Sequence, residues 1–67
     1  MKNIISILMP SITYIEWERC TIDTISEVME ITNSDAQGIV ETNPKLMATS
    51  WNKGLMPEEV VHIIINK

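Results

Sequence analysis

The side chains of this 67-residue chain that could take part in chemistry are mostly carboxylates. Two carboxylates held close together can act as general acid and general base, but such pairs on a small helical protein are usually surface charge. Three acidic pairs occur close together in the sequence: Glu16 with Glu18, Glu27 with Glu30, and Glu58 with Glu59.

Other reactive groups are scarce. The chain has one cysteine, Cys20, and one histidine, His62, which is too few ligands for a recognisable metal site. We expect Cys20 to be a small buried hydrophobe and His62 a partly buried histidine in an apolar helix. The two glycines, Gly38 and Gly54, form no phosphate-binding loop. The sequence therefore predicts no cofactor, no metal and no enzymatic activity.

Charge is unevenly distributed along the chain. Residues 16–41 hold seven acidic residues and one basic residue, Arg19, so this segment nets −6 within a total of −4. The flanking segments, residues 1–15 and 42–67, each net +1. One face should be electronegative, either as a solvated surface or as a surface that docks onto a basic partner.

Two capping boxes indicate a pair of consecutive helices. Thr24 with Glu27, and Ser34 with Gln37, fit the pattern in which a hydroxyl caps the third helical N–H and a side chain three residues later reaches back. Asn33 suits the turn between the two helices because asparagine tolerates left-handed backbone. Helix starts ten residues apart predict a helix-turn-helix.

Proline and glycine divide the second half of the chain. A break or kink is expected at Pro44, which either interrupts the preceding helix or, with Asn43 as N-cap, is the first residue of a new one. Gly54 ends the segment that follows, and Pro57 opens the last helix. We expect one domain over residues 1–67, an all-α bundle of four or five short helices. Its expected elements are residues 11–20 capped by Ser11, 24–32, 35–43, 45–53, and a helix from Pro57.

An α+β arrangement is the alternative, because residues 60–65 have strong β-propensity and could pair with residues 4–8 as two strands. The capping chemistry at Pro57 favours a helix. The expected core comprises Ile15, Ile25, Val28, Met29, Ile39, Val40, Leu46, Met47, Trp51, Val60, Val61 and Ile64.

In a DNA-binding protein of this kind, the second helix of the pair, residues 35–43, would contact the DNA. Gln37 could read adenine, but Asp35 and Glu41 would face phosphates and residues 35–43 contain no Lys or Arg. Direct DNA binding is therefore the alternative function. The apolar run at residues 4–9 is too short to span a bilayer, and the single cysteine suggests the reducing cytoplasm.

Two segments carry a resemblance to known proteins. SEVMEITNSDAQGIVE resembles the helix-turn-helix core of small phage and plasmid regulators, and WNKGLMPEEVVHIII resembles the short helical tail of small mobile-element proteins. Together the two segments cover about half of the chain. The resemblance implies a phage- or plasmid-type accessory protein that uses a helix-turn-helix-like scaffold on a protein partner.

The sequence thus predicts a non-enzymatic protein-binding regulator or inhibitor that acts on a host or regulatory protein, with no membrane association. A homodimer is a second expectation, because a domain of this size buries only about 60% of its unfolded surface. Aromatic anchors could come from Tyr14, Trp17 or Trp51, which could equally belong to the core. The expected contact residues are Glu16, Glu27, Glu30, Asp35, Gln37 and Glu41.

Overall fold

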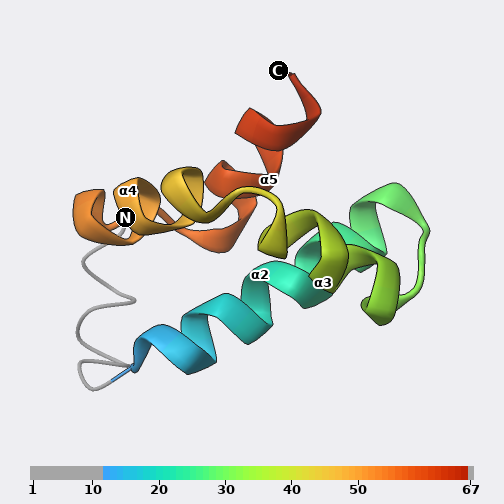
Figure 1. Ribbon diagram of the computed structural model, residues 1–67, viewed down its shortest axis with the longest axis horizontal. Coiled ribbons are helices and arrows are strands. Elements are labelled where there is room, and N and C mark those ends of the chain that lie inside the picture. Colours follow the sequence, from blue (N-terminus) through green and yellow to red (C-terminus); the bar gives the residue numbers. More distant parts are fainter. Residues whose placement is uncertain (1–11, 67) are drawn as a thin grey trace.

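The computed structural model describes residues 12–66, which form helices and no strand (Figure 1). The all-α prediction is confirmed. Residues 60–65 are helical, so the α+β alternative is wrong for them, and its other strand, residues 4–8, lies outside the described residues. The helices are α2 (Tyr14–Met29), α3 (Asn33–Glu41), α4 (Pro44–Lys53) and α5 (Pro57–Ile65).

Helix α2 joins two segments that were expected to be separate helices. Its capping box is formed by Thr13 and Glu16: the N–H of Glu16 donates to Thr13 Oγ1, and the N–H of Thr13 donates to Glu16 Oε1, both at 3.1 Å. Thr24 is not a cap, because its hydroxyl donates to the carbonyl of Cys20, 2.8 Å away and one turn earlier. The helix continues through Thr24 since a threonine hydroxyl can be satisfied inside a helix in this way.

The turn between α2 and α3 is three residues long. Glu30 adopts left-handed backbone, with φ 57° and ψ 47°, and its N–H donates to Ser26 O. The N–H of Ile31 also donates to Ser26 O, at 3.1 Å, and the Ser26 hydroxyl donates to Ile31 O at 2.6 Å. The expected left-handed residue, Asn33, is instead the first residue of α3.

Helix α3 is capped by Thr32, whose Oγ1 accepts a 3.1 Å hydrogen bond from the N–H of Asp35. The expected cap, Ser34, lies inside the first turn. Serine and threonine are both favoured at the N-cap, and the cap here is the earlier of the two residues.

The proline and glycine predictions are confirmed. Pro44 is the first residue of α4 and Pro57 the first residue of α5. Gly54 ends α4 with φ 73°, a left-handed conformation that glycine adopts without a Cβ penalty.

The core lies where α2 packs against α3 and α5, with α4 closing the other side against α3 and α5 (Figure 1). Five of the expected core residues are buried and four more, Ile39, Leu46, Trp51 and Ile64, are half-buried. The described residues that form the buried apolar core are Trp17, Ile25, Ala36, Val40, Met47, Val60 and Val61.

Three expected core residues, Ile15, Val28 and Met29, are exposed. The inward stripe of the single long helix runs through Trp17, Thr21 and Ile25, four residues apart, which turns Ile15 outward. Val28 and Met29 extend this stripe into the last turn of α2, where their side chains remain open to solvent.

Candidate protein-interaction surface

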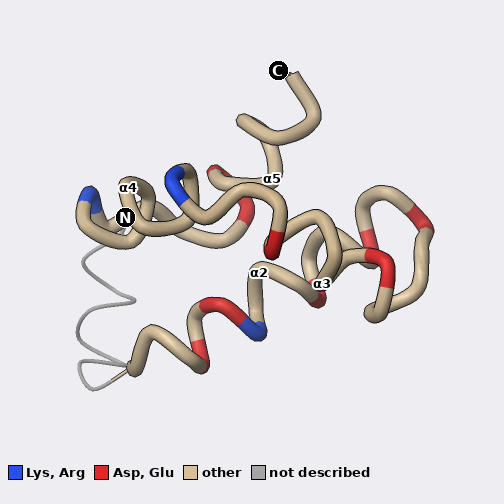
Figure 2. The backbone as a smooth tube through the Cα atoms, in the orientation of Figure 1, with Lys and Arg blue, Asp and Glu red and all other residues tan. Residues whose placement is uncertain are grey.

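Four acidic residues lie in or on either side of the turn that joins α2 to α3, and we call them the acidic corner: Asp23, Glu27, Glu30 and Asp35. All four residues are exposed. Figure 2 shows acidic residues on both sides of this turn, whereas the lysines of α4 lie away from it.

The acidic corner is held together by hydrogen bonds between and within its two helices. The Asn33 side chain, at the start of α3, donates to Asp23 Oδ1 on α2 over 2.9 Å. The backbone N–H of Asp35 is bound by the Thr32 cap, so the Asp35 carboxylate begins at a fixed position in the first turn of α3. Its carboxylate lies near the positive end of the α3 macrodipole, a favourable position for a negative charge.

The acidic corner carries an excess of negative charge. Asp23 and Glu27 are four residues apart on one face of α2, a spacing at which like charges destabilise a helix, and Arg19 lies four residues before Asp23 on the same face. No lysine or arginine within residues 12–66 forms an ion pair with these carboxylates. The acidic corner is therefore an exposed negative surface that has no ion pair within residues 12–66.

The acidic corner contains only part of the expected contact set. Glu27, Glu30 and Asp35 belong to it, whereas Glu16 lies in the first turn of α2, about 20 Å along the helix axis from Glu30. The Glu16 carboxylate serves as the partner of Thr13 in the capping box.

The other two expected contact residues form a separate pair on α3. The Gln37 amide donates to Glu41 Oε2 at 3.0 Å, and both side chains are exposed. Asp23 was missed because its spacing of four from Glu27 has meaning only when residues 14–29 form one continuous helix.

The aromatic residues considered as anchors form a cluster instead of an open surface. Trp17 is buried, Tyr14 and Trp51 are half-buried, and the three ring centroids lie 5.3 to 5.5 Å apart. Burial raises the pKa of the Tyr14 hydroxyl above its ordinary value, and the nearby charge of Glu18 raises it further. The cluster contributes packing between α2 and α4.

Cys20 and His62 are both exposed, so the prediction of burial is wrong for each. Cys20 sits beside the inward stripe of α2, and His62 follows the two buried valines of α5. Across residues 12–66 no three His, Cys, Asp or Glu side chains are grouped so that they could hold a metal ion. No described helix is long and apolar enough to cross a membrane.

The fold and its surface define a small all-helical protein with an acidic corner between two packed helices. Comparison of the chain with protein-family models, with curated proteins and with solved structures gives no match. Its function must therefore be argued from the charge, exposure and geometry of its residues.

Proposed function

We propose that this chain is a non-enzymatic protein-binding module, a small regulator or inhibitor that covers a basic surface of a host or regulatory protein. The observation that carries the proposal is the acidic corner, in which four exposed acidic residues lie in or beside the α2–α3 turn without an ion pair to a cation of the described chain. The phage or mobile-element character of the proposal comes from the resemblance of its two sequence segments to such proteins.

A basic partner would supply what the acidic corner lacks. Lysine or arginine placed against these carboxylates forms charge-assisted hydrogen bonds and relieves their mutual repulsion. Complementary charge also accelerates encounter, and this acceleration falls as salt screens the field. A regulator of this kind acts by occupying its partner's surface and needs no catalytic group.

A cytoplasmic location is part of the proposal. The chain has a single cysteine, Cys20, and hence no disulfide of its own, and its thiol is exposed. Such a thiol is compatible with a reducing compartment.

Direct DNA binding is the alternative function. It would use the exposed face of α3, where Gln37 already donates its amide to Glu41 and where Asp35 adds a further negative charge. Affinity for DNA depends largely on cations that neutralise phosphates, and α3 contains none. The acidic corner therefore favours a protein partner.

The proposal is tested by affinity capture from a bacterial lysate, with and without nuclease, read by mass spectrometry. The expected result is a protein recovered in stoichiometric amount in both arms and lost with the Glu27→Lys/Glu30→Lys variant. The matched control, Glu18→Lys/Glu58→Lys, makes the same change in net charge outside the acidic corner and should retain the protein.

Two outcomes contradict the proposal. Recovery of DNA, or of proteins that disappear after nuclease treatment, would support the DNA-binding alternative. Equal loss of the captured protein with both double variants would mean that total charge, not the acidic corner, governs capture.

A further inference from the structure

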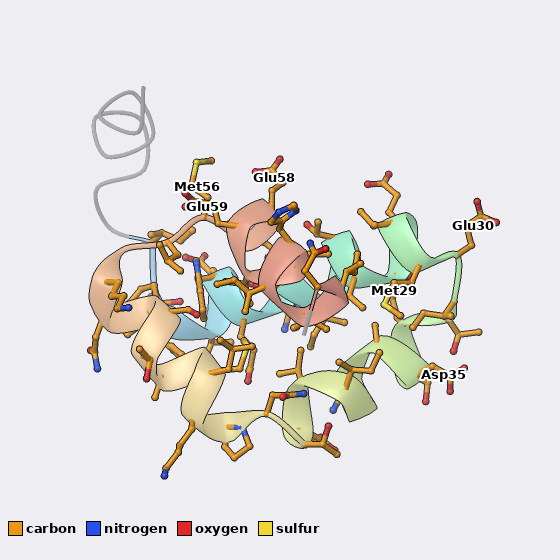
Figure 3. All side chains as sticks on the ribbon, turned by 90° about the horizontal axis from the view of Figure 1, so that it is seen from above. Met29, Glu30, Asp35, Met56, Glu58 and Glu59 are labelled. Atoms are coloured by element: carbon orange, nitrogen blue, oxygen red, sulfur yellow. The ribbon has the colours of Figure 1, made fainter. Side chains whose placement is uncertain are left out.

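Two exposed apolar side chains lie at the C-terminal end of α2, next to the acidic corner. Val28 is 54% exposed and Met29 is 40% exposed, and both lie between Glu27 and Glu30 in the sequence. In Figure 3 Met29 lies between Glu30 and Asp35, with the two carboxylates toward the edge of the molecule. Scattered exposed apolar residues are normal on proteins. An exposed apolar pair next to carboxylates differs from them because it offers apolar contact and negative charge together.

Val28 and Met29 are a continuation of the inward stripe of α2. Val28 follows Ile25 by three residues and Met29 follows it by four, the spacings that place side chains on one side of a helix. Ile25 is fully buried, so the same face passes from buried to exposed within one turn. This pair therefore extends the apolar face of α2 out to the surface.

We propose that Val28 and Met29 bind the apolar side of a basic amphipathic segment from a partner protein, while lysines or arginines beside it meet the acidic corner. The inference rests on the proposed function and specifies the chemistry of its partner. Burial of apolar side chains would supply affinity, and the surrounding charge would select basic segments. The flexible thioether of Met29 can adapt to side chains of different shape.

Charge argues against a second copy of the chain as the occupant. A twofold contact centred on this pair would bring the carboxylates beside it on one copy close to those on the other, because an isologous interface uses one patch twice. Residues 16–41 of each copy carry a net charge of −6. Such a contact would oppose like charges, whereas a basic segment would neutralise them.

The test uses the full chain and two synthetic amphipathic peptides, one with leucine on one face and lysine on the other, the second with glutamate in place of lysine. Binding of each fluorescently labelled peptide is followed by anisotropy over a range of salt concentrations. The leucine–lysine peptide should bind and the leucine–glutamate peptide should not. Replacement of both apolar residues, Val28→Ser/Met29→Ser, should weaken binding about tenfold or more.

The control is Ile15→Ser, which removes an even more exposed apolar residue, 65% accessible, from the first turn of the same helix beside Glu16. This variant should bind the peptide as the unaltered chain does. The Glu27→Gln/Glu30→Gln variant should bind more weakly and with a smaller dependence on salt. Far-ultraviolet circular dichroism of each variant checks that helicity is retained.

Equal affinity of the double serine variant, or an equal loss with Ile15→Ser, would overturn the inference. A dimer in sedimentation velocity that the double serine variant dissociates would also overturn it, since the pair would then be a self-interface. The proposed function and this inference can fail separately. A captured protein that is lost with the Glu27/Glu30 variant but still binds the double serine variant would leave the proposed function standing and would exclude only the apolar contact.

Discussion

The indole Nε1 of Trp17 donates a 2.9 Å hydrogen bond to the carbonyl oxygen of Leu55, 38 residues later in the chain. Trp17 belongs to α2, and Leu55 lies in the connection between α4 and α5. Only 4% of Trp17 is exposed, and its ring contacts both Tyr14 and Trp51. One side chain thus combines apolar burial with a polar link between distant parts of the fold.

Replacement of this indole should be costly. Trp17→Phe keeps an aromatic ring but removes the N–H donor and leaves the Leu55 carbonyl without its partner, a loss of about 1–3 kcal/mol in the free energy of unfolding. The smaller ring adds a further cost from lost packing. Urea denaturation measures the change. Trp51→Phe is the control, because Trp51 makes ring contacts but no hydrogen bond within residues 12–66; an equal loss in both variants would contradict the role assigned to the bond.

The two threonines of α2 should respond differently to alanine. Thr13 caps the helix through Glu16 N, so Thr13→Ala should lower the free energy of unfolding by about 1 kcal/mol. Thr24 lies inside the helix, where alanine has the higher propensity, so Thr24→Ala should change stability by less than about 0.5 kcal/mol. Chemical denaturation measures the free energy of unfolding of both variants. A larger loss with Thr24→Ala than with Thr13→Ala would indicate that a helix starts at Thr24.

The left-handed backbone of Glu30 should make glycine favourable at that position. A side chain in this conformation costs about 1–2 kcal/mol, so Glu30→Gly should stabilise the fold by about 1 kcal/mol after the entropy of glycine is deducted. Glu30→Ala removes the same charge but keeps the Cβ atom, and thereby separates backbone strain from repulsion within the acidic corner. If alanine stabilises as much as glycine, repulsion is the cause.

The pKa of Tyr14 should lie above its ordinary value of 10.0 in the folded protein, chiefly because of burial and then because of Glu18. Folding favours the neutral form of the Tyr14 hydroxyl. Its contribution to the free energy of unfolding is therefore complete below the pKa of the unfolded chain and is lost as pH rises through the pKa of the folded protein. Since Tyr14 is the only tyrosine, phenolate absorbance reports its titration directly. The pH at the midpoint of this titration should be lower in Glu18→Gln, and an unchanged midpoint would exclude the contribution of the Glu18 charge. Tyr14→Phe should remove the corresponding loss of stability at alkaline pH.

Helix ends that are marked by proline or glycine could be predicted from the sequence. Helix ends that depend on which of several hydroxyl side chains acts as the cap could not. Pro44 and Pro57 fix φ and lack an N–H, Gly54 adopts positive φ without a Cβ penalty, and all three lie at the helix ends expected of them. Hydroxyl residues are ambiguous, because they can cap a helix or bond back to its carbonyls. Thr24 takes the second option, and the division of α2 was wrong for that reason.

The candidate site was predictable in its charge but not in its composition. The excess of acidic residues between positions 16 and 41 is visible in the sequence. Which of these residues share a surface depends on the length of α2, which separates Glu16 from Glu30 and adds Asp23 to the acidic corner. The exposure of Val28 and Met29 likewise depends on where the neighbouring helices end. The spacing of apolar residues within α2 does not predict those ends.

The position of α5 in the chain has a consequence for biosynthesis. Val60 and Val61 are buried in the core and α5 packs against α2, yet a ribosome makes α5 after every other described helix. At about 5–20 residues per second, roughly 2–7 s separate completion of α2 from completion of α5. During that interval α5 is not yet available to pack against α2, so the core around Trp17 and Ile25 closes late in synthesis.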